Sequence, residues 1–158
     1  ILKRLDGRGI LIAVDATKDL LVNVLEYHPF LVKPNNHELG EIFGVELKDR
    51  ESVIPYAKKM QEMGAANVLV SMAGEGAVLA AANGKVYLAP APKGTLVNGV
   101  GAGDSMVAGF LAGWLKEKDY RYAFHMGIAT GSASAFSEYL ATREQIEEVY
   151  RQVTSEER

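Results

Sequence analysis

The chain has 158 residues, of which 48% are hydrophobic and 23% charged, and its formal net charge is −3. This composition is ordinary for a folded globular protein, and the negative charge removes the electrostatic case for nucleic-acid binding. No apolar run reaches the roughly 18 residues that a membrane span needs, and the absence of cysteine excludes disulfide bonds. We therefore expect no nucleic-acid partner, no membrane partner and a cytoplasmic location.

The chain opens with two predicted strands. Residues 9–15 form a continuous apolar run, typical of a strand buried on both faces of a parallel sheet. Asp15 ends this run, at the edge where ligands gather in open α/β sheets, although it could instead cap the helix that follows. Residues 30–32 predict a second short strand, which Pro34 ends.

Asn35 is the next residue with two interpretations. With Glu38 three residues later it is typical of a helix N-cap and its capping box. A role in a ligand site is the alternative for this pair. His37, which lies between them, is expected to face solvent, because nothing nearby completes a set of metal ligands.

The middle of the chain predicts a short helix within residues 41–47 that ends near Gly44, a helix over residues 49–63 and a third strand over residues 67–71. A hairpin over residues 78–88 follows, turning at Asn83-Gly84, a sequence that favours tight hairpin turns. The glycines between the third strand and this hairpin are either plain turn residues or part of a ligand-binding loop.

The most informative stretch covers residues 97–105 and reads Val-Asn-Gly-Val-Gly-Ala-Gly-Asp-Ser. Its glycines allow a tight turn and close approach of a ligand to the backbone. An amphipathic helix follows at once, so the turn should lie at a helix N-terminus, where free N–H groups and the positive end of the dipole attract anions. Asp104 falls in the first helical turn, and the alternative is that it merely caps the helix.

The last two predicted helices complete the fold. Asp119-Tyr120 is predicted to cap a helix over residues 121–136. The small-residue run 129–135 of this helix indicates close packing on the sheet or on a neighbouring helix. Residues 142–145 form a capping box for the final helix. We predict a single α/β domain, with a mostly parallel sheet, helices on both faces and an antiparallel hairpin at one side.

The run Gly-Ala-Gly-Asp-Ser at residues 101–105 closely resembles the C-terminal signature of the ribokinase-like (PfkB) sugar kinases. Residues 97–110 are most similar to the branch of 1-phosphofructokinases and tagatose-6-phosphate kinases. Lys-Pro-Asn-x-x-Glu at residues 33–38 and Ser-x-x-Gly-x-Gly-Ala at residues 71–77 match two further landmarks. The resemblance covers most of the chain and implies a ribokinase-like, three-layer α/β/α fold.

Family members carry a substrate-binding half and a β-sheet lid before this point. The resemblance therefore implies that residues 1–158 are the C-terminal nucleotide-binding and catalytic part of a longer kinase. The isolated chain is then expected to be inactive, and a homodimer of the full-length protein is one option.

The resemblance also implies a role for each motif. Asp104 would be the catalytic base, and the backbone amides of Gly101, Ala102 and Gly103 would form an anion hole. ATP would contact a larger set of residues: Ser71, Met72, Ala73, Gly74, Glu75, Gly76, Gly103, Asp104, Ala129 and Ser132. Asn35 and Glu38 would arrange Mg²⁺ and phosphate through water, since an amide and a carboxylate suit a hard cation that keeps its waters.

The activity implied in this way is ATP-dependent phosphorylation of a sugar phosphate. Fructose 1-phosphate, giving fructose 1,6-bisphosphate, comes first, and tagatose 6-phosphate or the substrate of another PfkB sugar kinase is the alternative. A dinucleotide-binding module fits less well, because G-x-G-x-x-G would need glycine where Asp104 stands, and a helix rather than a strand follows. An inactive nucleotide-binding fragment is the remaining alternative.

Overall fold

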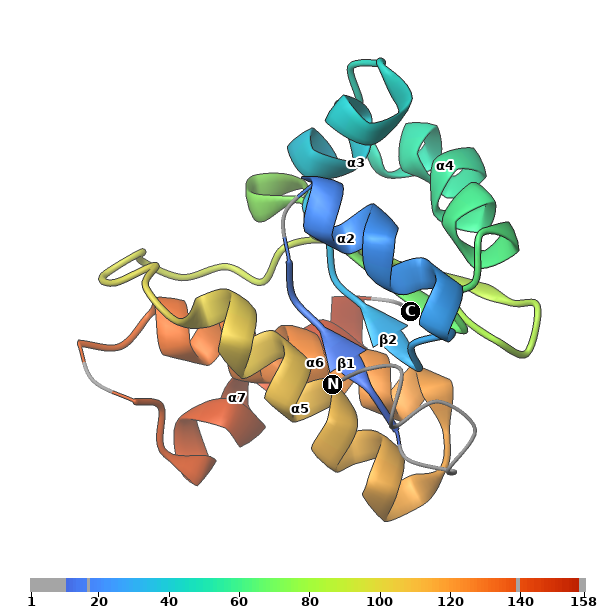
Figure 1. Ribbon diagram of the computed structural model, residues 1–158. Helices are drawn as coiled ribbons and strands as arrows, with labels where there is room; N and C mark the ends of the chain where they lie inside the picture. Colours follow the sequence, from blue (N-terminus) through green and yellow to red (C-terminus); the bar gives the residue numbers. More distant parts are fainter. Residues whose placement is uncertain (1–10, 17, 139, 157–158) are drawn as a thin grey trace. The chain divides into compact units, whose positions relative to one another are not determined.

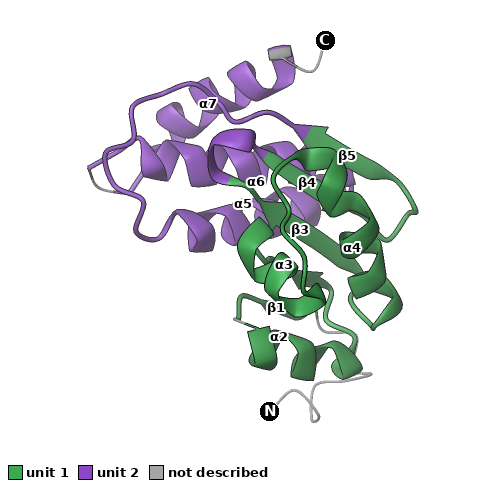
Figure 2. Ribbon diagram, turned by 90° about the horizontal axis from the view of Figure 1, so that it is seen from above, with its two compact units in different colours: residues 1–72, 77–88 green, residues 73–76, 89–158 purple. Residues whose placement is uncertain are grey.

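The computed structural model describes residues 11–16, 18–138 and 140–156 (Figure 1). The chain divides into two compact units, the first formed by Ile1–Met72 and Ala77–Leu88 and the second by Ala73–Gly76 and Ala89–Arg158 (Figure 2). The first unit contains most of the sheet with its first three helices, and the second contains the three C-terminal helices.

A five-stranded mixed sheet has its strands in the same order as the chain: β1 Ala13–Val14, β2 Leu31–Val32, β3 Asn67–Ser71, β4 Ala77–Ala80 and β5 Val86–Ala89. Strands β1, β2 and β3 are parallel, and β4 is antiparallel to β3. The connection between β4 and β5 is too short for a parallel crossover, and Gly84 takes the left-handed conformation (φ 83°) that its turn requires. The predicted third strand and hairpin are confirmed.

The helices of the first unit are α2 Lys18–Val24, the 3-10 turn η1 Leu25–Tyr27, α3 Asn36–Phe43 and α4 Arg50–Glu62. They pack their apolar faces on the sheet in one hydrophobic core. Its fully buried members include Leu21, Leu39, Met60, Val68 and Val70.

Side chains on the other face of the sheet, such as Leu31, Leu69 and Leu79, are also fully buried. Burial on both faces explains the continuous apolar runs of these strands, because side chains at every position avoid water.

Two predicted boundaries were wrong. The strand predicted over residues 9–15 is only Ala13–Val14, with residues 9 and 10 outside the described part; before it, Leu11 is 42% exposed. The helix predicted to start at residue 41 instead starts at Asn36, because the Asn35 cap begins it earlier. Its predicted end near Gly44 is confirmed, since this residue is the C-cap with φ 67°.

The second unit contains the short 3-10 turn η2 Ala73–Glu75 and helices α5 Ala102–Glu117, α6 Tyr120–Ala135 and α7 Arg143–Glu156. The predicted cap of α6 is confirmed, since the Asp119 side chain accepts a hydrogen bond from the Tyr122 N–H at 2.8 Å. Phe110 of α5 and Phe124 of α6 are fully buried.

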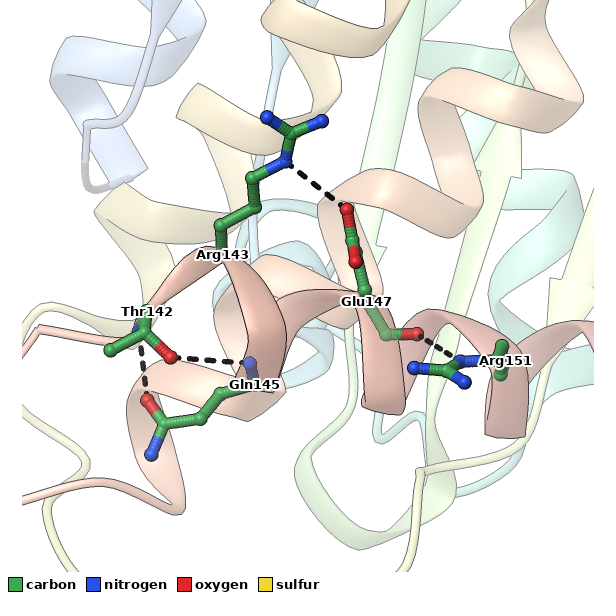
Figure 3. Close-up of polar contacts among 5 residues, drawn as sticks. All are labelled: Thr142, Arg143, Gln145, Glu147 and Arg151. Carbon is green, nitrogen blue, oxygen red and sulfur yellow. Dashed lines mark hydrogen bonds and ion pairs between the residues drawn. The ribbon is translucent and has the colours of Figure 1, made fainter.

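Helix α7 starts at the predicted capping box (Figure 3). The Thr142 N–H donates to Gln145 Oε1 at 2.8 Å, and the Gln145 N–H donates to Thr142 Oγ1 at 3.2 Å. Arg143, the next residue after Thr142, donates from Nε to Glu147 Oε1, four residues later, at 3.1 Å (Figure 3). Local side-chain chemistry therefore sets the start of this helix.

Candidate active site

The glycine-rich turn ends at the N-terminus of α5, as predicted. Gly101 is the N-cap residue, in a left-handed conformation (φ 81°), and it has no side chain to satisfy the helix amides. The Ala102 N–H donates to the Gly99 carbonyl at 3.3 Å, and the Ser105 N–H to the Gly101 carbonyl at 2.9 Å. Within the described residues, the two amides between them have no backbone acceptor. This end of α5 therefore presents free donors to an anion.

Asp104 does not cap α5, because the N-cap position belongs to Gly101. It is the third residue of the helix, its side chain is exposed, and no hydrogen bond to it is found in the described part of the chain. A carboxylate here gains from the helix dipole and stays accessible to a ligand. The capping interpretation of Asp104 was wrong.

Asn35 and Glu38 form a complete capping box at the start of α3. The Glu38 N–H donates to Asn35 Oδ1 at 2.8 Å, and the Asn35 N–H donates to Glu38 Oε1 at 3.0 Å. The structural alternative for this pair is therefore confirmed. It still leaves the second carboxylate oxygen of Glu38 for a water molecule, so capping does not exclude the magnesium role.

The Asn35 segment lies beside the start of the 71–76 loop. Asn35 pairs with Ser71 in an isolated parallel bridge, and the Ser71 N–H donates to the Pro34 carbonyl at 3.1 Å. Two motifs far apart in the sequence thus meet where β2 and β3 end. No group of three His, Cys, Asp or Glu side chains that could hold a metal occurs among the described residues, and His37 is exposed.

Lys33 is a residue to which sequence reasoning gave no role. Its side chain is only 8% exposed, and its ammonium lies 3.8 Å from Asp15 Oδ1. Helix α2 begins at Lys18, so Asp15 is too early in the chain to be its N-cap. Asp15 directly follows β1 and Lys33 directly follows β2, and these two parallel strands are neighbours in the sheet. The sequence signal that could have indicated a site role for Lys33 is its place directly after a buried strand.

The 71–76 loop is shaped by backbone geometry. Gly76 has φ 96°, and a Cβ on it would overlap the Ala89 carbonyl, so no other residue fits there. Gly74 has open space around it. Ala73, Gly74 and Glu75 are exposed, whereas the Met72 side chain is part of the core of the first unit. Met72 can therefore serve a ligand only through its backbone.

The small residues of α6 pack against α5. A Cβ on Gly127 would lie 3.0 Å from the Met106 carbonyl oxygen, and a Cβ on Gly131 would lie 3.0 Å from the Ala102 carbonyl oxygen. Close helix packing, the structural alternative, is thus confirmed for these glycines. Of the two residues predicted to contact ATP, Ala129 is fully buried and Ser132 is half-buried.

Solved structures share this fold. A Staphylococcus aureus protein assigned to the phosphofructokinases is 38% identical, with a TM-score of 0.90 over 96% of this chain and 49% of its own. Escherichia coli phosphofructokinase-2, solved with substrates and products, is 26% identical, with a TM-score of 0.85 over 98% of this chain and 53% of its own. Arabidopsis thaliana ribokinase, solved with ribose and ATP, is 19% identical, with a TM-score of 0.77 over 95% and 50%. The fold is ribokinase-like, as predicted.

The model of the pfkB family of carbohydrate kinases matches residues 8–146, and the chain belongs to this family. A Bacillus subtilis 1-phosphofructokinase is 50% identical over 142 residues, which are 90% of this chain and 46% of that protein. A Klebsiella oxytoca D-tagatose-1-phosphate kinase is 31% identical over 142 residues, again 90% and 46%. The chain spans about half the length of these curated relatives. Among the helices of the described residues, none is long and apolar enough to cross a bilayer.

Proposed function

We propose that the protein containing this chain transfers the γ-phosphoryl group of ATP to a hydroxyl of a sugar phosphate. Residues 1–158 would be its C-terminal nucleotide-binding and catalytic part. The observation that carries the proposal is the N-terminus of α5, which has no side-chain cap. Asp104 lies there in the first helical turn, next to amides that have no backbone acceptor. Membership of the pfkB carbohydrate kinases supports the same reaction.

Asp104 would accept the proton of the attacking hydroxyl, and the hydroxyl oxygen would then bond to the γ-phosphorus as ADP leaves. The amides of Gly101, Ala102 and Gly103 would stabilise the charge that develops on the transferred phosphoryl group. Of these, the Ala102 amide also donates to Gly99 in the turn, so Gly103 has the freer donor. Phosphoryl transfer depends mainly on such positioning and charge stabilisation.

ATP would lie along the residues of the 71–76 loop and of α6. The exposed residues of this loop, Ala73, Gly74 and Glu75, belong to the same compact unit as Gly103 and Ser132, which supports a shared nucleotide site. Ser132 is the stronger candidate on α6, because Ala129 is fully buried. Magnesium would neutralise charge on the phosphates, and Glu38 with Asn35 would hold it through water. Lys33, a buried cation beside these residues, would add a second positive charge for the phosphates.

The favoured substrate is fructose 1-phosphate, phosphorylated to fructose 1,6-bisphosphate. A 1-phosphofructokinase shares 50% identity with this chain, against 31% for a D-tagatose-1-phosphate kinase. Tagatose 6-phosphate, or the substrate of another PfkB sugar kinase, is the second candidate. The isolated chain is expected to be inactive. The intact protein is expected to be cytoplasmic and to form a homodimer. A related phosphofructokinase-2 has a tetrameric inhibited form.

The intact protein should be assayed with Mg-ATP against fructose 1-phosphate, fructose 6-phosphate and tagatose 6-phosphate, following ADP release. We expect turnover with fructose 1-phosphate and formation of the bisphosphate. Turnover only with another sugar phosphate would correct the substrate. Nucleotide binding without turnover of any of them would favour the alternative of an inactive nucleotide-binding protein.

A further inference from the structure

The C-terminal end of α6 holds the glycine-rich turn from both sides. The Ala135 carbonyl oxygen accepts hydrogen bonds from the Val97 N–H at 2.9 Å and the Asn98 N–H at 3.0 Å. The Ser134 hydroxyl donates to Ser105 Oγ at 3.0 Å. One set of bonds holds the chain before the turn and the other holds the residue next to Asp104. The turn is therefore built against α6 and not by its own residues alone.

Gly131 lies four residues before Ala135 in α6. It leaves the glycine-rich turn no room to move toward this helix. A Cβ on Gly131 would lie 3.0 Å from the Ala102 carbonyl oxygen and 3.0 Å from Met106 Cβ. The Ala102 carbonyl and the Gly103 N–H belong to one planar peptide group, so any rotation of the carbonyl also rotates the N–H. Gly131 is thus in direct contact with the peptide group that carries the proposed anion-hole donor.

We propose that Gly131 and Ser134 of α6 are positioning residues for phosphoryl transfer. Gly131 sets the orientation of the Gly103 amide through the Ala102–Gly103 peptide, and Ser134 holds the first turn of α5, which carries Asp104, through Ser105. Neither residue touches the substrate. This inference rests on the proposed function and explains the small residues of α6 by catalytic geometry as well as by packing.

Gly113 offers a matched control at the other end of the same helix pair. A Cβ there would lie 3.0 Å from Ala123 Cα and 3.2 Å from Met126 Cβ, a similar crowding far from the turn. Gly131→Ala and Gly113→Ala should therefore lower the melting temperature of the intact protein similarly. In the proposed kinase, kcat should fall about tenfold to a hundredfold in Gly131→Ala only, since small displacements of reacting groups cost rates of that order. The KM for the sugar phosphate should change less than about twofold, because substrate contacts stay in place.

Ser134→Ala gives a second test should Gly131→Ala not fold. Its control is Ser137→Ala, two residues after the end of α6, which removes a hydroxyl that donates to the Ala133 carbonyl at 2.7 Å. We expect a several-fold loss of kcat for the first variant and none for the second. Hydrogen exchange of the Ala102 and Ser105 amides, which donate to the Gly99 and Gly101 carbonyls, should quicken in Gly131→Ala and Ser134→Ala when measured without substrate, and not in the controls.

Equal effects of each variant and its control on kcat and on exchange would overturn the inference. Failure of the proposed function has a different signature. A wild-type protein without phosphoryl transfer, whose Ala102 and Ser105 amides still exchange faster after Gly131→Ala, would keep the contact between α6 and the turn but lose the kinase assignment.

Discussion

Helices α3 and α5 each have an acidic third residue, but only in α3 does this residue take part in a capping box. In α3, Glu38 is the third residue after the Asn35 cap, and the two residues satisfy each other's N–H groups. In α5, Asp104 is the third residue after Gly101, which has no side chain to give. The first helix end is closed by its own residues, and the second is left open. An acidic residue in the first turn therefore does not by itself identify a ligand site; the residue at the cap decides whether the amides remain free.

Replacing Asp104 is expected to have the largest effect on activity. Asp104→Asn removes the proton acceptor and keeps the shape, so kcat of the intact kinase should fall by about 10²–10⁴. The melting temperature should hardly change, because the Asp104 side chain makes no capping bond. Steady-state kinetics and thermal unfolding measure the two effects.

Asp119→Asn is the control for loss of a carboxylate at a helix start. Asp119 caps α6 through the Tyr122 N–H, and asparagine caps equally well, so both activity and stability should be kept. Retained turnover in Asp104→Asn together with a lowered melting temperature would return Asp104 to a structural role and remove the central residue of the kinase proposal.

Replacing Glu38 tests whether the closed helix end also serves magnesium. Glu38→Gln keeps the capping box, since glutamine fills the same position, and removes only the charge. We expect a several-fold higher Mg²⁺ concentration for half-maximal rate, with the melting temperature nearly unchanged. Titrations of Mg²⁺ at saturating ATP and sugar phosphate would show this, and an unchanged Mg²⁺ dependence would leave Glu38 with its capping role alone.

The smallest effect, on stability, should separate the two helix ends directly. Asn35→Ala removes the side chain that accepts the Glu38 N–H and should lower the free energy of unfolding by about 1 kcal/mol. Asp104→Ala removes no capping bond and should change it by less than about 0.5 kcal/mol, the range of an exposed substitution. Urea unfolding of both variants measures the difference. Equal losses would show that the end of α5 is closed by contacts of Asp104 after all.

Much of this chain could be predicted from its sequence because the signals are local. Helices α4, α6 and α7 begin where Asp49, Asp119 and Thr142 provide capping side chains. The glycine-rich turn falls at a helix N-terminus because the glycines and the apolar period of α5 are adjacent in the chain. Residues next to one another in the sequence can satisfy one another, so their pattern is enough.

Contacts between distant segments were decided only by the tertiary structure. The pairing of Asn35 with Ser71 and the buried Lys33 beside Asp15 follow from the order of the parallel strands, which no single segment encodes. The run of small residues in α6 was compatible with a pocket or with close packing. Its glycines pack against α5 because the backbone atoms that exclude a Cβ at Gly131 come from residues about thirty positions earlier in the chain. The sequence shows that the side chains of α6 are small. Only the tertiary structure shows that α5 occupies the space beside its glycines.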